Sequence, residues 1–248
     1  SHDQIEVIVI ESKVDVRAGK SKVSLPTLSA DDFPIMSFEK TENQIEITSN
    51  ELMNLINKTS FAMAYQDARH FLNGLHLCSE NGKLISVCTD GHRLAKYESS
   101  TSYNNELSII IPRKAIIEIN RILASFNDNK DNIVEFSITN NAVQLFINDY
   151  HVTSKLIEGN YPNFNKVIPS DTKSKISVDK ATFKNSLNII SKVVNQQYKG
   201  VKLTPQKTSL HLITSNTESE IGEDEIEASY DGDDMSIGFN ISYIQDVI

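Results

Sequence analysis

The segment Thr89-Asp-Gly-His-Arg-Leu94 gathers more side chains capable of chemistry than any other stretch of the chain. In a hydrolase, Asp90 and His92 would form an acid/base pair. No serine, cysteine or metal-ligand spacing nearby supplies the third group that such a site needs. The alternative is a structural turn, in which Asp90 caps backbone amides and Gly91 adopts a left-handed conformation.

A second polar cluster lies in the segment Tyr65-Gln-Asp-Ala-Arg-His-Phe-Leu-Asn-Gly74, which we expect to form a loop or an irregular helix. Arginine and glutamine donate hydrogen bonds to phosphate oxygens, and an aromatic ring can rest against a sugar or a base. An ordinary solvated loop would have the same composition. On the first interpretation, the residues that contact DNA are Gln66, Arg69, His70 and Phe71.

Two expected helices carry basic residues on their outer faces. Lys180 and Lys184 are four residues apart, on the side of their helix opposite to its apolar stripe. The other helix follows Pro112 and carries Arg113, Lys114 and Arg121. Such faces could line one channel and contact phosphates without reading bases, although charged outer helix faces are usually only solvated.

The overall charge argues against a protein that wraps nucleic acid with a basic surface. With 33 acidic residues against 24 lysines and arginines, the net charge is -9. A ring could still be acidic outside and basic within. Gly-rich phosphate loops, nucleophile elbows, paired catalytic carboxylates and zinc-ligand spacings are all missing from the sequence. We therefore expect a binding protein without catalytic activity, cofactor or metal.

The sequence indicates a soluble, cytoplasmic protein. Hydrophobic residues make up 39% of its 248 residues, and no apolar run is long enough for a membrane span or a signal peptide. Cys78 and Cys88 flank the turn signal Asn81-Gly82, without the register of a disulfide or the spacing of a metal motif. We expect both thiols to be reduced.

The chain contains an internal repeat. The segment 22–34 matches the segment 150–162 in length and pattern, with Leu28 over Leu156, Phe33 over Tyr161 and Pro34 over Pro162. At the same offset Ser49 falls on Ser177, and each serine is expected to cap the N-terminus of a helix. Further along, Gly74 aligns with Gly200, each ahead of a hairpin.

Each repeat unit is predicted to be an α+β domain, with a helix, paired strands, a second helix and more strands. One helical face of the later unit is expected to be formed by Phe183, Leu187, Ile190 and Val194. The helix that begins at Pro112 should turn inward Ile116, Ile119 and Leu123. Partial two-residue alternation predicts strands at 5–10, 133–138 and 142–147.

The phase of the repeat predicts three domains. Residues 1–42 match only the second part of a unit, residues 43–170 form a complete unit, and residues 171–248 match only the first part. A unit that lacks half of its strands cannot pair its sheet edges. We therefore expect the sequence to be a piece of a longer protein. The acidic stretch 218–234 is interpreted as a solvated edge.

The sequence resembles the bacterial sliding clamps, the beta subunits of the replicative DNA polymerase III. The resemblance covers nearly the whole chain and is carried by four blocks, 61–74, 89–94, 111–114 and 238–243. It implies the DNA-clamp fold, in which repeated domains each pack two helices on antiparallel sheets. It also implies a head-to-tail homodimer of three-domain subunits, a ring with helices inside and sheets outside.

The resemblance further implies a non-catalytic processivity factor that encircles duplex DNA without sequence preference and holds replication enzymes on it. The implied partners are the polymerase catalytic subunit, the clamp loader, and other polymerases and repair proteins. These would dock short motifs in a pocket between the second and third domains. The matching positions here are Leu72, Thr89, Gly91, His92, Arg93, Leu94, Pro162, Lys166, Val167, Tyr198, Asn240 and Tyr243.

The chain departs from the family pattern at several positions. Lys166 stands where an arginine is common, Tyr198 where a phenylalanine is common, and His70-Phe71 where two aromatic residues are frequent. Ring closure would use the edges near 22–25 and 192–194. Two other classes stay open at this point, a hydrolase that loses activity in His92→Ala and a protein-binding scaffold indifferent to DNA.

Overall fold

The computed structural model describes residues 4–34, 43–126, 132–170, 172, 174–195 and 197–248. The chain forms two compact units, one up to Lys40 and one from Thr41 to the last residue. Within the described residues, no helix is long and apolar enough to cross a lipid bilayer. The predicted domain boundaries after residues 42 and 170 both adjoin residues outside the described part.

The first unit is a three-stranded antiparallel sheet in the order β1-β2-β3. Its strands are β1 (Glu6–Ile10), β2 (Lys13–Ala18) and β3 (Ser21–Pro26), followed by the short 3-10 helix η1 (Ala30–Asp32). Among its described residues only Asp15 is buried, and Lys22 pairs with that carboxylate at 2.8 Å. Leu28 and Phe33 are 90% and 73% exposed. Among the residues that the structure describes, this unit therefore has no hydrophobic core of its own.

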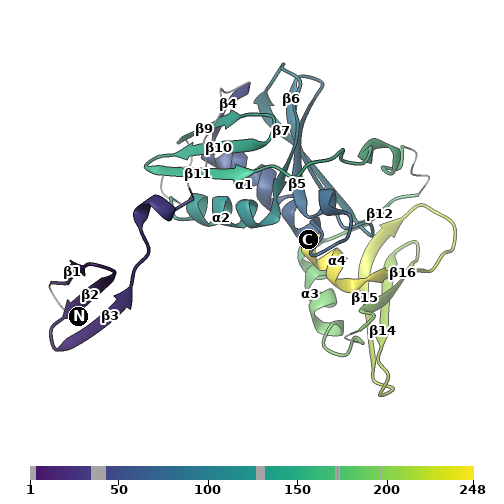
Figure 1. The fold of residues 1–248 in the computed structure, drawn as a ribbon. Helices are drawn as coiled ribbons and strands as arrows, with labels where there is room; N and C mark the ends of the chain where they lie inside the picture. Colours follow the sequence, from purple (N-terminus) through teal and green to yellow (C-terminus); the bar gives the residue numbers. More distant parts are fainter. Residues whose placement is uncertain (1–3, 35–42, 127–131, 171, 173, 196) are drawn as a thin grey trace. The chain divides into compact units, whose positions relative to one another are not determined.

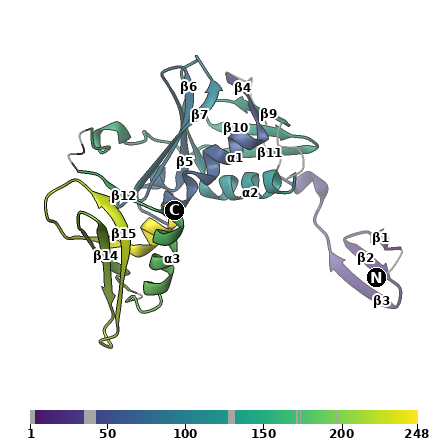
Figure 2. The ribbon, with the colours of Figure 1, turned by 180° about the vertical axis from the view of Figure 1, so that it is seen from behind.

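The second unit begins with two four-stranded sheets, β11-β10-β9-β4 and β7-β6-β5-β8. Their strands are β4 (Asn43–Thr48), β5 (Gly74–Glu80), β6 (Lys83–Thr89), β7 (Leu94–Ser102), β8 (Ser108–Pro112), β9 (Ile133–Ile138), β10 (Ala142–Ile147) and β11 (Tyr150–Lys155). The helices α1 (Ser49–Asn57) and α2 (Arg113–Ala124) lie side by side (Figure 1; Figure 2). The connection between α1 and β5 holds the 3-10 helices η2 (Ser60–Ala62) and η3 (His70–Leu72).

The core of this part forms because apolar residues recur on one face of each helix. In α2 the buried residues are Ile116, Ile119, Ile122 and Leu123, and α1 adds Leu52, Leu55 and Ile56. Both sheets contribute alternating side chains, Val134 and Phe136 from β9 and Leu75 and Leu77 from β5, so helices and sheets share one cluster. The turn Asn81-Gly82 has φ values of 52° and 75°, which suits a tight hairpin.

The rest of the unit is a five-stranded sheet in the order β12-β15-β14-β13-β16. After the 3-10 helix η4 (Phe164–Lys166) come β12 (Ile176–Val178), α3 (Lys180–Ile190), β13 (Gly200–Pro205), β14 (Ser209–Ser215), β15 (Ile221–Tyr230), β16 (Ile237–Asn240) and α4 (Ile241–Val247). Both helices contact the sheet and each other (Figure 1). A second apolar cluster lies between these helices and the sheet.

These elements confirm the α+β fold and the alignment of the repeat on its glycines. Gly74 begins β5 and pairs with Pro112, and Gly200 begins β13 and pairs with Asn240. The strands predicted at 133–138 and 142–147 match β9 and β10, and β1 begins one residue later than the strand predicted at 5–10. Cys78 and Cys88 are unpaired and buried, as expected.

The predicted helix caps were wrong. Thr48, one residue before Ser49, accepts the hydrogen bond from the amide of Glu51 at 3.2 Å. In the later repeat the cap is Asp179, while Ser177 lies within β12. A carboxylate or hydroxyl caps equally well, so the chain offered several candidates at each start. Val194 is buried in the same cluster as Leu187, but it lies beyond the end of α3.

Candidate functional site

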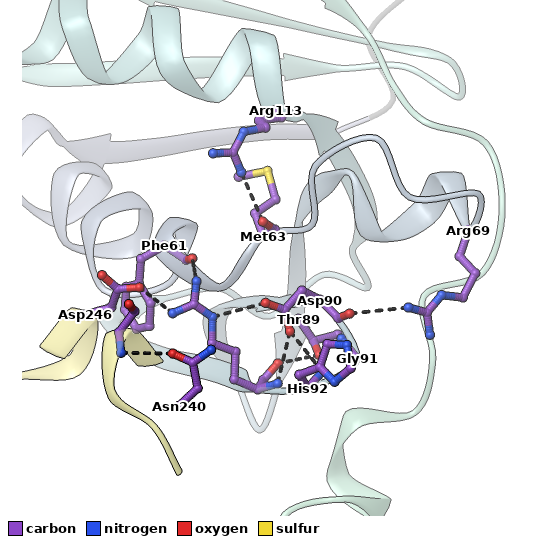
Figure 3. Close-up of polar contacts among 12 residues, drawn as sticks. Phe61, Met63, Arg69, Thr89, Asp90, Gly91, His92, Arg113, Asn240 and Asp246 are labelled. Carbon is purple, nitrogen blue, oxygen red and sulfur yellow. Dashed lines mark hydrogen bonds and ion pairs between the residues drawn. The ribbon is translucent and has the colours of Figure 1, made fainter. Parts of the chain in front are cut away.

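The segment between β6 and β7 is a tight turn built on its own polar side chains. Oδ1 of Asp90 accepts hydrogen bonds from the amides of His92 and Arg93 at 2.9 and 3.0 Å. Thr89 accepts from the amide of Gly91 at 3.1 Å and donates to the carbonyl of Arg93 at 2.6 Å (Figure 3). Gly91 has φ of 88°. The structural interpretation of this turn is confirmed, and the Asp90 carboxylate is used in capping it.

Arg93 is the most heavily bonded side chain of the turn, and it is only 19% exposed. Its Nε donates to Asp90 at 3.2 Å, its Nη2 to the carbonyl of Phe61 at 2.5 Å, and its Nη1 to Asp246 at 2.5 Å. The guanidinium carbon lies 4.4 Å from the ring centre of Tyr243 and 5.5 Å from that of Phe61. These contacts fix the guanidinium between the turn and α4.

A cavity of about 460 Å³ lies beside this turn, and we call it the turn cavity. Its walls come from η3, from the turn and from the segment that contains η4. Apolar side chains predominate, with a few polar groups at the rim. The lining residues are Arg69, Phe71, Leu72, Thr89, Gly91, His92, Arg93, Leu94, Tyr161, Pro162, Asn163, Phe164 and Val167.

A second cavity of about 570 Å³ lies on the other side of the turn, and we call it the helix cavity. It is lined by His92, Arg93, Val178, Lys180, Phe183, Phe239, Tyr243, Ile244, Val247 and Ile248. The two cavities share His92 and Arg93, so these two side chains form a common wall. The geometry suits a ligand with an apolar part on either side of that wall.

The η4 wall of the turn cavity is held from behind by a polar cluster. Lys96 pairs with Glu80 at 2.9 Å, and the amide of Asn165 donates to the same carboxylate at 2.7 Å. The Lys96 ammonium also lies 5.1 Å from the ring centre of Phe164, which is buried beneath the cavity. The hydrogen bond from Lys96 lowers the pKa of Glu80. This cluster ties the η4 segment to β5 and β7.

We expect Glu80→Gln to lower the free energy of unfolding by about 1 kcal/mol, because it removes a charge shared by Lys96 and Asn165. Glu98→Gln is the matched control, since Glu98 pairs with Lys83 on the same sheet but is more exposed. An exposed pair contributes little, so this control should change stability by less than about 0.5 kcal/mol. Urea unfolding of both variants measures the difference, and equal effects would contradict the role of the cluster.

Arg69 is bound to its own loop. It pairs with Asp67 at 2.8 Å. It also donates a hydrogen bond to the carbonyl of Asp90 at 3.3 Å (Figure 3). The hydrogen bonds from its side chain and backbone amide lower the pKa of Asp67 to about 2. A Cβ placed on Gly91 would stand 2.9 Å from Nη2 of Arg69, so this glycine leaves room for the guanidinium.

The other residues predicted to contact DNA are differently placed. Arg113 donates to the carbonyl of Met63 at 3.0 Å (Figure 3), and its guanidinium carbon lies 5.7 Å from the ring centre of Tyr65. Arg69 and Phe71 line the turn cavity. The remaining five are exposed, namely Gln66, His70, Lys114, Lys180 and Lys184. Lys180 also lines the helix cavity.

Most of the residues proposed for the docking pocket lie together. Eight line the turn cavity, namely Leu72, Thr89, Gly91, His92, Arg93, Leu94, Pro162 and Val167, and Tyr243 lines the helix cavity. Three line neither cavity. Lys166 is exposed on η4, Tyr198 lines a separate hollow beside β13 and β14, and Asn240 caps α4 through the amide of Ser242 at 3.0 Å.

Sequence reasoning missed several residues of this site. Phe61 and Asp246 bind Arg93 from distant parts of the chain. Tyr161 and Phe164 line the turn cavity. Two signals could have found some of them: Tyr161 matches Phe33 in the repeat, and Asp246 follows Tyr243 by three residues, which is one helical face. Within the described residues, no group of three or more histidine, cysteine or acidic side chains is placed to hold a metal ion.

Most of the second unit matches two domains of one known protein family. Residues 46–163 match the central domain of the DNA polymerase III beta subunit, and residues 165–248 match its C-terminal domain. The chain belongs to the DNA polymerase III beta subunit family. The resemblance found in the sequence is thereby confirmed. The turn cavity is lined almost wholly by residues of the central-domain match, and the helix cavity mainly by residues of the C-terminal match.

Several beta sliding clamps are similar over nearly the whole chain. Those of Pseudomonas aeruginosa and Escherichia coli K12 are each 33% identical over 246 residues, which cover 98% and 99% of this chain. In both cases the chain spans 66% of the length of the relative. The sequence therefore corresponds to somewhat less than two thirds of these relatives.

Solved structures of the family confirm the clamp fold. The P. aeruginosa DNA polymerase III subunit beta has a TM-score of 0.89 at 33% identity, covering 98% of this chain and 66% of its own. A Bartonella birtlesii sliding clamp bound to griselimycin has a TM-score of 0.89 at 28% identity, with the same coverage. A P. aeruginosa sliding clamp was also solved bound to griselimycin, with a TM-score of 0.85 at 33% identity; it covers 98% of this chain and 65% of its own.

Proposed function

We propose that this chain is part of a processivity clamp, a protein that encircles duplex DNA and tethers the replicative DNA polymerase to it. The observation that carries the proposal is the pair of cavities that share the His92 and Arg93 wall, in a chain of the beta subunit family. Apolar walls on both sides supply anchor positions for a short peptide, and the polar groups of the turn orient it.

The proposed docking site comprises the nine cavity residues already predicted from the sequence, together with Tyr161 and Phe164. Lys166, Tyr198 and Asn240 complete the set on the family resemblance alone. The proposed partners are the polymerase catalytic subunit, the clamp loader, and other polymerases and repair proteins that carry clamp-binding motifs. Griselimycin, which is bound to two of the solved relatives, is proposed to occupy the same cavities here.

Retention on DNA is proposed to be topological. A closed ring needs only weak contacts with phosphate, so a chain with net charge -9 can stay on DNA without a strongly basic surface. Exposed Lys114, Lys180 and Lys184 are the best candidates for these contacts, because Arg69 and Arg113 already bind groups of their own chain. Gln66, His70 and Phe71 complete the proposed DNA-contacting set.

The proposed assembly is a head-to-tail homodimer in the cytoplasm. Residues 1–42, 43–170 and 171–248 would belong to successive clamp domains, and the subunits would meet at the edge strand β3 and the segment 192–194. No catalytic step is assigned to the chain. The Asp90 carboxylate accepts hydrogen bonds from two amides of the turn and pairs with Arg93. These bonds support a structural role for Asp90 instead of a role as an acid or base.

We expect the chain to bind griselimycin, and Val167→Ser to weaken that binding about tenfold. Val167 lines the turn cavity and is 68% exposed, so its loss removes contact with the ligand and leaves the fold intact. Tenfold corresponds to about 1.4 kcal/mol, which is the burial of roughly 55 Å² of apolar surface at 25 cal/mol per Å². Isothermal titration calorimetry measures both affinities.

The matched control is Ile168→Ser. Ile168 is the next residue and partly exposed, but it lines neither cavity. Its replacement should leave the affinity within about twofold of the wild type. If the wild-type chain does not bind griselimycin, the docking function is contradicted. If both variants weaken binding equally, the ligand does not occupy the turn cavity.

A further inference from the structure

Asp246 differs from the other hydrogen-bond acceptors of Arg93 in the part of the chain from which it comes. The other hydrogen-bond acceptors of the guanidinium are Asp90 and the carbonyl of Phe61, both within the residues matched to the central domain. Asp246 lies in α4, within the residues matched to the C-terminal domain, 153 residues further along the chain. Among the described residues it is the one hydrogen-bond partner of this guanidinium contributed by the C-terminal match (Figure 3).

The helix α4 presents two groups to the same guanidinium. Tyr243 and Asp246 are three residues apart and so lie on one helical face. The Tyr243 ring stacks against Arg93 at 4.4 Å, while the carboxylate of Asp246 pairs with Nη1. The helix is itself fixed, because Ile241 is buried in the core beneath it and Gln245 donates to Asn188 of α3 at 3.0 Å.

The position of the guanidinium matters because Arg93 forms part of the wall between the turn cavity and the helix cavity. An arginine side chain has many rotamers, and only its partners select one of them. Two carboxylates pair with the guanidinium, Asp90 from the residues matched to the central domain and Asp246 from those matched to the C-terminal domain. Charge-assisted hydrogen bonds are short and directional, so they fix the guanidinium plane as well as its place.

We propose that Asp246 is a positioning residue for peptide docking, which acts by holding Arg93 in the wall shared by the two cavities. This inference rests on the proposed docking function. Asp246 lines neither cavity, so it acts on a ligand only through Arg93. Without its charge, the guanidinium keeps Asp90, the Phe61 carbonyl and the Tyr243 ring but loses its charge-assisted bond to α4. The two halves of the docking site are then held less firmly relative to each other.

The first experiment measures the affinity for griselimycin by isothermal titration calorimetry. Asp246→Asn is expected to weaken binding about tenfold. It replaces a charge-assisted hydrogen bond with a neutral one, so the Arg93 side chain is held less firmly between the two cavities. Asp246→Glu restores the carboxylate and should bind within about threefold of the wild type. Asp234→Asn is the control, since it removes one surface charge outside both cavities. Thermal unfolding of each variant shows whether it is folded at the temperature of the titration.

A double-mutant cycle separates positioning from a merely structural role. Arg93→Met keeps an unbranched apolar stem against Tyr243 but removes the guanidinium. In this background, Asp246→Asn should change the affinity by less than twofold, because the group through which it acts is gone. An undiminished tenfold effect there, or unchanged affinity of folded Asp246→Asn alone, would overturn the inference. If the wild type fails to bind griselimycin, the proposed docking function fails first.

Discussion

Replacing Gly74 by alanine is expected to lower the free energy of unfolding by about 3 kcal/mol or more. A Cβ at this position would stand 2.6 Å from the carbonyl oxygen of Ile111, 2.7 Å from Cγ2 of Ile110 and 3.0 Å from Cδ1 of Ile157. The oxygen belongs to the β5–β8 ladder, in which Gly74 pairs with Pro112 and Leu75 with Ile111, so it cannot move away alone. Overpacking typically costs about 1–3 kcal/mol, and the fixed carbonyl oxygen places this site at the upper end of that range or above it.

The repeat supplies the matched control. Gly200 begins β13 as Gly74 begins β5, but a Cβ on Gly200 would meet nothing within 4 Å. Gly200→Ala should therefore change stability by less than about 1 kcal/mol, and the lower entropy of the unfolded chain favours the alanine. Chemical denaturation of the two variants compares the sites directly. Similar losses from both would show that the crowding around Gly74 relaxes easily.

The chain is expected to lose stability through His76 as the pH falls from 6.5 to 4. His76 is 6% exposed and stacks on Tyr161 at 4.5 Å between ring centres, and its Nδ1 has no hydrogen-bond partner in the described part of the chain. Burial lowers its pKa to about 4 from 6.5. Between these values the unfolded chain binds a proton that the folded chain does not. The folded state therefore loses up to about 3 kcal/mol over this range, and the loss is complete below pH 4.

His76→Phe tests this directly, because phenylalanine keeps the stacked ring and cannot take up a proton. The stability of the variant relative to the wild type should rise by about 3 kcal/mol between pH 7 and pH 4, measured by urea unfolding across the range. Ser108→Ala is the control. It removes the partner of Nε2, which lies at 3.1 Å, but leaves the imidazole buried. Its pH profile should follow the wild type, and a profile unchanged in His76→Phe would contradict the assignment.

The sequence predicted best those elements whose pattern is local. The strands at 133–138 and 142–147 and the apolar face of α2 depend on side-chain periodicity within a few residues. The capped turn at Asp90 was one of the two interpretations that the sequence left open, and it could be recognised because its caps reach only two or three residues along the chain. Repeat alignment on Gly74 and Gly200 added the prediction of a hairpin after each glycine, and the structure has these hairpins as β5–β6 and β13–β14.

Contacts between distant segments were not predictable in this way. The pair of Arg93 and Asp246 joins residues 153 positions apart, and no local pattern in the sequence links the two. Phe164 is buried although its neighbours Asn163, Asn165 and Lys166 are polar, so no periodicity marks it. Lys96 and Glu80 place that segment through tertiary packing alone. A resemblance to a family could indicate such a site but could not supply these bonds.

The described residues around the β1–β3 sheet bury almost no apolar side chains, and this affects how stability is distributed along the chain. Its strands are joined by backbone hydrogen bonds, but Leu28 and Phe33 stay in water and Asp15 is its single buried described residue. Such a sheet is expected to open at small free-energy cost, so its amide hydrogens should exchange with solvent before the rest of the molecule unfolds. Amides packed against α1 and α2 should exchange only on global opening, and the two units would then exchange in separate steps.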